Sequence, residues 1–345
     1  MKTTVMVPLV GLSLSVACQA IPNQPATGSA ACALFPDDLS AEELFGERNN
    51  GRSLTGEDGP ELMGVAYAGA VLGGGQSVTD VAVVGGHLQG RIVGAGGAGQ
   101  MVEGDAWTGA LLNGQVPNAL VPIRIDRVDV VDADLHLYTL SRRRHGAQGP
   151  EWAPFCHVSD DGDVRAVAVA ARWNEHGDRV ESVDHFTFGC RSGAIAKCIV
   201  AGYRPWLPAQ GAAPMTDVHQ ACTRAITADY CGNGKPHTLN GTPINIVDQL
   251  APPIRPHFVD VRLYEAAWTR FGAYCLSHVR WDFLPPECDM QSEPGIPRGP
   301  FARDPNGARL AARTCDDPAA AAAMGTPVVL FSESLEQGRE DVVEK

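Results

Sequence analysis

Cysteine and histidine side chains, which can bind metal ions or attack electrophiles, gather in one short stretch of the sequence. His219 and Cys222 lie three residues apart, and Cys231 and His237 follow with five residues between them. His219 and Cys222 would share one face of a helix, and imidazole and thiolate groups are ligands of structural zinc. Cys231 could instead form a nucleophilic pair with His237 or His219, oriented by Asp229, because a thiolate beside an imidazole is an activated nucleophile. The state of the cysteines decides whether either chemistry is available.

The first 20 residues have the features of an export signal. Residues 5–17 are uncharged and mostly apolar, too few to span a bilayer as a helix but suited to a signal peptide. Small residues then run into Cys18, which resembles a bacterial lipoprotein signal; ordinary cleavage after Ala20 is the alternative. We expect residues 1–20 to direct export and Cys18 to be lipidated. The mature chain would then lie in the cell envelope, at the outer membrane or cell surface, or be secreted if Cys18 is not lipidated.

Export changes the expected chemistry of the ten cysteines. In an oxidising compartment cysteines form disulfides and are not available as zinc ligands, so we expect no metal and no cofactor. We predict three or four disulfides, drawn mainly from Cys156, Cys190, Cys198, Cys222, Cys231, Cys275, Cys288 and Cys315. Removal of Cys18 from the ten leaves an odd number, so at least one thiol would stay free or pair with another chain. That leftover thiol is the support for a nucleophile based on Cys231.

Composition limits the class of partner and indicates a chain rich in turns. Lys+Arg 27 against Asp+Glu 40 gives a net charge of −13, which argues against nucleic acid or an anionic membrane as the main partner. No stretch after the signal approaches the about 20 apolar residues of a membrane helix, so we expect membrane contact only through the lipid anchor. Glycine (38) and proline (25) are abundant. We therefore predict a β-rich α+β fold of short strands and hairpins with two or three short helices and a disulfide-stapled C-terminal half.

Changes in composition divide the chain into five segments. They are a signal (1–20), a polar tether with a short helix (21–49), a Gly-rich β region (50–116), a cysteine-rich domain (117–290) and a Pro/Ala-rich segment (291–345). A capping box at Ser40–Glu43 predicts the short helix, and recurring Leu-polar-Gly units in the Gly-rich region predict short strands closed by glycine turns. Apolar alternation over 119–140 predicts further strands. Helices are predicted at 193–201 and 215–229.

One pattern occurs twice in the cysteine-rich domain. Val164–Trp173 and Val261–Trp268 both end in tryptophan, with a glycine four residues later. Each is followed by a second segment that contains a cysteine, His185–Cys190 in the first copy and Ala273–Leu276 in the second. We interpret both copies as β-hairpins in which Gly177 and Gly272 take the left-handed turn position. A helix is the alternative for the second copy, because its apolar residues also recur with helical spacing.

Several short motifs surround the tetrad Ala228-Asp229-Tyr230-Cys231. They are Trp152–Cys156, Phe186–Cys190, Lys197–Cys198, Gly202–Trp206, Gly241–Pro243 and Trp268–Cys275. As a set they resemble the ADYC-domain family of bacterial extracytoplasmic proteins, which is named for the tetrad. The resemblance covers roughly residues 120–290. It implies a cysteine-rich exported domain, often on lipoproteins, and assigns no reaction.

The tetrad is interpreted as a structural corner. Asp229 stands where the preceding helix should end, ahead of Gly232 and Gly234, which can take the left-handed conformation that terminates helices. Its carboxylate is short enough to accept amide hydrogens of the turn that follows. We expect Tyr230 to bury its ring beside the helix with its hydroxyl hydrogen-bonded, and Cys231 to fix the corner with a disulfide.

Three weaker motifs are assigned to turns or loops. Gly94-x-Gly96-x-x-Gly99 fits a dinucleotide-binding pattern but lacks a following helix. Asp160–Asp163 lacks the ligand spacing of a calcium loop. The basic cluster Arg142–His145 is interpreted as a solvent-exposed loop, with a site for an acidic ligand as the alternative.

No residue pattern names a reaction. We therefore expect a non-catalytic, surface-anchored extracytoplasmic module with a structural role or with an unknown protein or glycan as its ligand. The alternative is a hydrolase or thiol-redox protein that uses an unpaired cysteine with His219 or His237.

Overall fold

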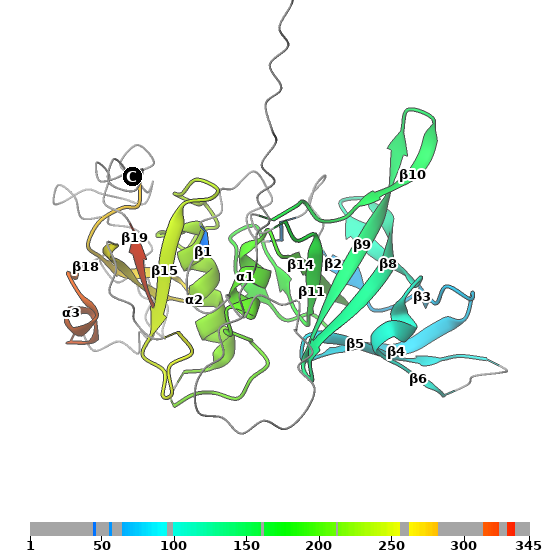
Figure 1. Ribbon diagram of the computed structural model, residues 1–345, viewed down its shortest axis with the longest axis horizontal. Helices are drawn as coiled ribbons and strands as arrows, with labels where there is room; N and C mark the ends of the chain where they lie inside the picture. Colours follow the sequence, from blue (N-terminus) through cyan, green and yellow to red (C-terminus); the bar gives the residue numbers. More distant parts are fainter. Residues whose placement is uncertain are drawn as a thin grey trace, which may run out of the picture. The chain divides into compact units, whose positions relative to one another are not determined.

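The computed structural model describes residues 44–45, 55–56, 64–94, 99–159, 162–211, 213–255, 262–281, 313–323 and 330–334. The expected export signal, the lipidation of Cys18, the candidate disulfide residue Cys288 and most of the tether lie outside these residues. None of the helices in these residues has the length and hydrophobicity of a membrane-spanning segment. The described chain forms two large sheets, a small two-stranded sheet and three α-helices (Figure 1).

Six strands close into a β-barrel. Each pairs antiparallel with two neighbours, in the ring order β2, β7, β8, β9, β11, β14 and back to β2. Their bounds are Gly64–Ala66 (β2), Leu111–Val116 (β7), Ala119–Asp132 (β8), Leu135–Gly146 (β9), Arg165–Val169 (β11) and His185–Cys190 (β14). The predicted fold class, an α+β fold of short strands and hairpins, is therefore wrong. The ring is closed, and β8 and β9 are 14 and 12 residues long.

Two irregularities explain why the sequence indicated short strands. The register between β8 and β9 shifts between Ile125 and Arg127 and again between Val130 and Asp132. An extra residue at a bulge disturbs the alternation of faces along a strand, so the apolar pattern breaks while the strand continues. Closure also needs β2, a three-residue strand that pairs with both β14 and β7. Nothing local in its sequence indicates those two partners.

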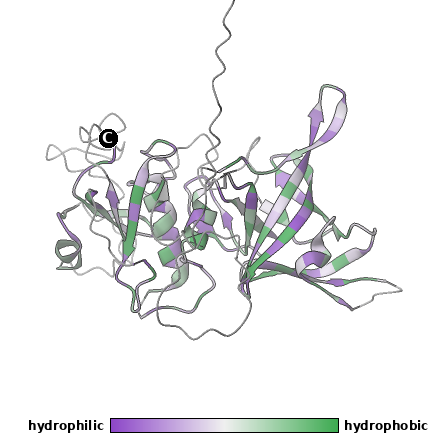
Figure 2. Ribbon diagram, viewed as in Figure 1, coloured by the Kyte–Doolittle hydropathy of each residue, from purple (hydrophilic) through white to green (hydrophobic). Residues whose placement is uncertain are grey.

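Aromatic side chains fill the barrel. The largest buried ones are Trp107, Tyr138, Phe155, Phe186 and Phe188. The Tyr138 hydroxyl accepts a hydrogen bond from the Leu88 amide (2.7 Å), and the Trp107 indole donates to the Leu88 carbonyl (3.0 Å). Hydrophobic and hydrophilic residues alternate along the long strands (Figure 2), which places one face of each strand in this core.

The Gly-rich region extends the barrel sheet. Strand β7 also pairs with β3, and the sheet continues through β4, β5 and β6. Their bounds are Ala70–Val71 (β3), Ser77–Val84 (β4), His87–Ile92 (β5) and Met101–Val102 (β6). Gly90 and Gly114 end two of the Leu-polar-Gly units, His87–Gly90 and Leu111–Gly114, for which we predict a turn at the glycine. Both glycines instead lie inside strands, β5 and β7. A Cβ atom at Gly90 would lie 2.5 Å from the Val78 side chain, so close packing accounts for that glycine.

The second sheet has six strands in the order β1, β15, β19, β16, β17, β18. Their bounds are Leu44–Phe45 (β1), Pro243–Asp248 (β15), Leu330–Ser334 (β19), Leu263–Thr269 (β16), Gly272–Leu276 (β17) and Arg313–Thr314 (β18). Helix α2 (Met215–Thr227) packs against β15, β16, β17 and β19. The disulfide Cys198–Cys222 joins it to α1 (Ala194–Val200). A second disulfide, Cys275–Cys315, joins β17 to the segment before α3 (Pro318–Ala323).

Local predictions for this half of the chain are largely confirmed. Helices α1 and α2 lie inside the predicted ranges, and β16 and β17 form the predicted hairpin, which excludes the helical alternative. In the first copy of the pattern, β12 (Arg172–Trp173) and β13 (Arg179–Val180) pair around Gly177, whose φ is +69°. Residues 44–45, expected in the short helix of the tether, instead form β1 and pair with β15.

Candidate functional site

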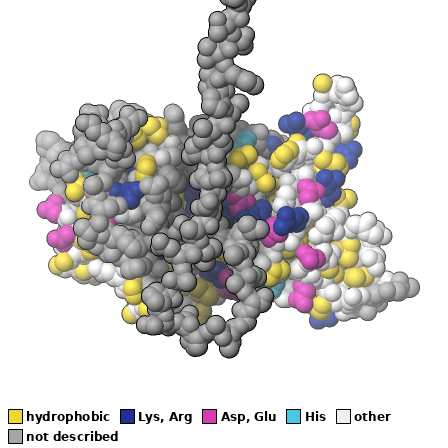
Figure 3. All heavy atoms as spheres, in the orientation of Figure 1, with side chains coloured by type: hydrophobic (Ala, Val, Ile, Leu, Met, Phe, Trp, Pro, Cys, Tyr) yellow, Lys and Arg dark blue, Asp and Glu magenta, His cyan; other side chains and the backbone are white. Residues whose placement is uncertain are grey.

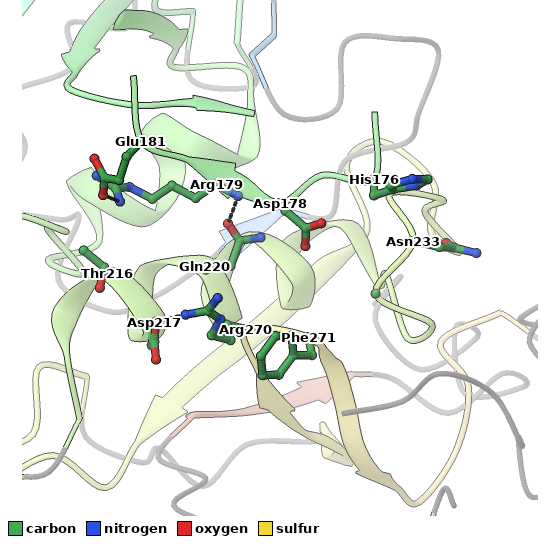
Figure 4. Close-up of a pocket in the computed structure, with 11 residues that line it drawn as sticks. His176, Asp178, Arg179, Glu181, Thr216, Asp217, Gln220, Asn233, Arg270 and Phe271 are labelled. Carbon is green, nitrogen blue, oxygen red and sulfur yellow. Dashed lines mark hydrogen bonds and ion pairs between the residues drawn. The ribbon is translucent and has the colours of Figure 1, made fainter. Parts of the chain in front are cut away.

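A cavity of about 690 Å³ lies where four segments of the chain meet (Figure 4). Its lining residues are Thr216, Asp217 and Gln220 from α2, His176, Asp178, Arg179 and Glu181 from the β12–β13 hairpin and its end, Gly232 and Asn233 from the turn after the tetrad, and Arg270 and Phe271 from the β16–β17 turn. The two hairpins belong to the two copies of the repeated pattern. Residues next to the tetrad and residues of both copies therefore line the same cavity, although the sequence indicated them only as separate features.

The tetrad ends helix α2 and shapes one wall of the cavity. Ala228 has left-handed backbone angles (φ +49°, ψ +40°) and ends the helix. The Asp229 carboxylate accepts hydrogen bonds from the amides of Asn233 (3.0 Å) and Gly234 (2.8 Å). These bonds confirm the predicted role of Asp229 in the turn. Because Asn233 lines the cavity, the carboxylate that holds the turn also fixes this part of the wall.

A buried arginine connects the three turns. Arg224 on α2 is 2% exposed and forms an ion pair with Asp229. It also donates to Asp178 Oδ1 and to the His176 carbonyl, both at 2.6 Å, and more weakly to the Arg270 carbonyl at 3.4 Å. One guanidinium thus contacts the tetrad and both hairpin turns. The sequence did not predict this role of Arg224. The one local indication of it is that a charged residue lies on the buried face of α2.

Gln220 attaches the first hairpin to helix α2. Its side-chain oxygen accepts from the Arg179 amide (2.9 Å), and its nitrogen donates to the Gly177 carbonyl (2.7 Å). The contact between Gln220 and Arg179 appears as a dashed line in Figure 4. Both ends of the buried carboxamide are therefore occupied, so Gln220 positions the hairpin and contributes a rigid part of the cavity floor.

The charged side chains at the cavity are paired with one another. Arg179 pairs with Glu181, and Arg270 pairs with Asp217 at 3.1 Å. The Arg270 guanidinium also lies 4.8 Å from the centroid of the Phe271 ring. With Asp178 held by Arg224, each carboxylate of the lining has an arginine partner. The wall therefore offers many hydrogen-bonding groups and little unbalanced charge.

Tyr230 belongs to a buried network behind the cavity. Its hydroxyl donates to Glu265 Oε1 (2.5 Å) and accepts from the Arg280 amide (2.8 Å), as the predicted corner requires. Its ring stacks on Trp268 with centroids 5.3 Å apart. Burial, and secondarily the Glu265 charge, raises the pKa of Tyr230 well above its usual value. The phenol therefore stays protonated and acts as a structural donor.

The cysteines at the candidate site are oxidised. Cys222 is bonded to Cys198 (2.06 Å) and Cys231 is disulfide-bonded as well. The remaining described cysteines form the bridges Cys156–Cys190 and Cys275–Cys315. The disulfide prediction is confirmed for seven of the eight candidates, because Cys288 lies outside the described residues. Neither Cys222 nor Cys231 is a thiolate that could bind zinc or attack a substrate.

The two candidate histidines do not line the cavity. His219 is fully buried, its Nε2 lies 3.1 Å from the Ile195 carbonyl, and its ring meets the edge of Trp173. Burial lowers the pKa of His219 to about 4. The His237 Nδ1 lies 3.1 Å from the Ala228 carbonyl, beside the Tyr230 ring. In the part of the chain that the structure describes, no group of three or more His, Cys, Asp or Glu side chains could hold a metal ion.

Asp229→Asn is expected to lower the free energy of unfolding by about 2 kcal/mol. The carboxamide can still accept an amide hydrogen but no longer balances the buried Arg224. Removal of one partner of a buried ion pair costs about 3–5 kcal/mol, and the remaining Asp178 partner reduces the effect. Urea denaturation followed by tryptophan fluorescence measures it.

Asp217→Asn is the matched control for this variant, because it removes a carboxylate from a half-exposed pair with Arg270. Such pairs contribute about 0–1 kcal/mol. Equal urea midpoints for the two variants would show that the Arg224–Asp229 pair does not support the fold.

Comparison with known protein families identifies a domain in this chain. The family model described as the ADYC domain matches residues 104–282, which is more than half of the chain. The match contains the tetrad, both copies of the repeated pattern and every residue that lines the cavity. No curated protein and no solved structure matches the chain.

Proposed function

The chain belongs to the ADYC domain family, and from this we propose that the turn after the tetrad builds a binding site for a small polar ligand. The protein would then be a non-catalytic binding module outside the cytoplasm. The observation that carries the proposal is the convergence of the tetrad turn and both repeated hairpins on one cavity, held by the buried Arg224. A turn with a purely structural role would not need to meet two other turns around an open space.

The chemistry of the lining favours a neutral glycan as the ligand. A ligand that carries a full charge would need an unbalanced partner, but Arg179, Arg270 and Arg224 already face carboxylates. Sugar hydroxyls both donate and accept, so they can bridge the carboxylate and guanidinium groups of such pairs. The Phe271 ring adds an apolar surface. A volume of about 690 Å³ falls within the range of about 300–1,000 Å³ that is typical of ligand sites.

Disulfides support a location in an oxidising compartment. We extend the proposal to a lipid anchor at Cys18, which would hold the module at the cell envelope. The alternative, a thiol-dependent hydrolase or redox protein, receives no support from the described residues, because each described cysteine is disulfide-bonded.

The test is thermal denaturation of the full chain with neutral oligosaccharides such as cellotetraose, maltotetraose and chitotetraose. A ligand at 100 times its Kd stabilises the folded state by about 2.7 kcal/mol, which should raise the Tm by several degrees. Thr216→Trp would place an indole ring at the wall of the cavity and should abolish the shift. Thr79→Trp, at an exposed threonine of β4, should leave it unchanged. Absence of a shift with all three sugars, or an equal shift in both variants, would contradict the proposal.

A further inference from the structure

The hairpin of β9 and β10 (Gly149–Pro154) continues past the edge of the barrel. Strand β8 begins to pair with β9 at Ile123 and Arg142. Beyond this point, within the described chain, Arg143–Gly146 pair only with β10. Figure 1 shows this part of the hairpin as a two-stranded ribbon that extends beyond β8. Such a ribbon has two faces without covering elements and adds little to a core.

The ribbon carries unbalanced positive charge. Three arginines follow one another on β9 at Arg142–Arg144. Arg144 pairs with Glu151 at 2.8 Å and Arg124 of β8 pairs with Asp126 at 2.5 Å. Within the described residues, Arg142 and Arg143 have no carboxylate partner. The Arg142 Nε is buried without a hydrogen-bond acceptor. Figure 3 shows several basic side chains on this part of the surface, with carboxylates among them. In a chain of net charge −13, this surplus is a local feature.

A tryptophan holds two of the guanidinium groups in place. Trp152 on β10 lies directly opposite Arg143. Side chains alternate between the two faces of a strand, so Ser141 lies on the same face as Arg143. Arg124 of β8 lies opposite Ser141. The Arg124 and Arg143 guanidinium carbons lie 4.6 Å and 5.5 Å from the Trp152 ring centroid. Cation–π contacts order these long side chains before any ligand arrives, and the exposed Arg143 keeps its N–H groups available.

We propose that this basic ribbon, formed by Arg124, Arg142–Arg144 and Trp152, binds an anionic polysaccharide. Guanidinium groups pair in two-point fashion with carboxylate, sulfate and phosphate oxygens. Arg124 and Arg143 lie on one face of the ribbon and Arg142 on the other. A polymer with repeated negative groups can contact several of these guanidinium groups at once. The proposal concerns a surface separate from the cavity and does not depend on the ligand proposed there.

Two other polyanions fit the observations less well. A lipid surface is usually bound with exposed apolar side chains as well as cations, but none of the exposed large hydrophobic residues lies within the described part of the hairpin at 141–154. Nucleic acid fits less well because the disulfides indicate a compartment outside the cytoplasm.

The test compares two double variants of the full chain that change the net charge equally. Arg142→Gln/Arg143→Gln removes the unpaired arginines. Arg91→Gln/Arg127→Gln removes two arginines whose partners are Asp80 and Asp129. Binding to heparin and to polygalacturonate is measured by titration at low and moderate salt. We expect at least tenfold weaker binding for the first variant, less than a twofold change for the second, and weaker wild-type binding as salt rises.

Further titrations test whether another class of ligand binds the ribbon instead. Dextran, a neutral polysaccharide, should not bind, and phosphatidylglycerol vesicles should bind more weakly than the two polyanions. Preference for the vesicles, equal loss in both double variants, or absence of wild-type binding to either polyanion would overturn the proposal. Arg143→Gln alone, at an exposed position, is included because it leaves the partly buried Arg142 in place. It should weaken binding severalfold with an unchanged Tm, and wild-type affinity in this variant would also count against the proposal.

Discussion

Replacement of Gly232 by alanine should unfold the protein under conditions in which the wild type is folded. Gly232 has φ +63°, and a Cβ atom there would lie 1.7 Å from the Phe271 carbonyl oxygen. That oxygen belongs to the backbone of the β16–β17 turn, which cannot rotate away as a side chain could. A clash of this kind combined with a left-handed backbone should cost more than about 4 kcal/mol. Far-UV circular dichroism and urea denaturation of the purified variant measure the loss.

Gly241→Ala separates the clash from the backbone strain. Gly241 also has positive φ (+78°), but no atom lies within 4 Å of the position its Cβ would take. Strain alone should cost about 1–2 kcal/mol. If both variants lose the same stability, the close approach of the tetrad turn to the β16–β17 turn does not control folding.

Arg280→Met should cost about 4 kcal/mol of unfolding free energy. Arg280 and Glu265 are both fully buried and pair at 3.1 Å. Arg280 also donates to the carbonyls of Ala225 (2.9 Å) and Ile226 (3.3 Å) at the end of α2. The substitution leaves the Glu265 charge unbalanced and removes donors from those carbonyls, and loss of one partner of a buried pair costs about 3–5 kcal/mol. Urea denaturation at neutral pH provides the measurement.

A double-mutant cycle with Glu265→Gln tests the mechanism. The double variant Glu265→Gln/Arg280→Met removes both charges, so it should be more stable than the sum of the two single losses predicts. Purely additive losses would mean that Arg280 acts through packing and not through its charge. The Trp268 ring stacked on Tyr230 offers a fluorescence signal close to the substitutions.

Much of the local structure could be predicted because its causes are local. The turn after Asp229 was indicated by the glycines that follow it and by the short reach of its carboxylate. The structure contains the expected hydrogen bonds, which the amides of Asn233 and Gly234 donate to this carboxylate. Both predicted helices and the β16–β17 hairpin likewise follow from residues that are neighbours in the sequence.

The barrel and the cavity depend on contacts between distant residues. Closure of the barrel requires that β2 insert between β14 and β7, and its sequence Gly64–Ala66 carries no sign of either partner. The cavity depends on Arg224, whose contacts with the His176 carbonyl and Asp178 span more than 40 positions. Residue types indicated cysteine and histidine chemistry, whereas the fold places paired charges at the cavity and seals the cysteines in disulfides.

The middle position of β19 has a consequence for the order in which a growing chain can fold. A polypeptide emerges from its N-terminal end, so all six barrel strands are present once residue 190 has appeared. The second sheet must wait for β19, which begins at Leu330 and lies between β15 and β16. Until then the strand that pairs with both β15 and β16 is missing. The face of α2 that packs against the sheet also lacks its contacts with β19. The barrel can therefore close early, while the second sheet, which supports the cavity, is completed only when β19 has emerged.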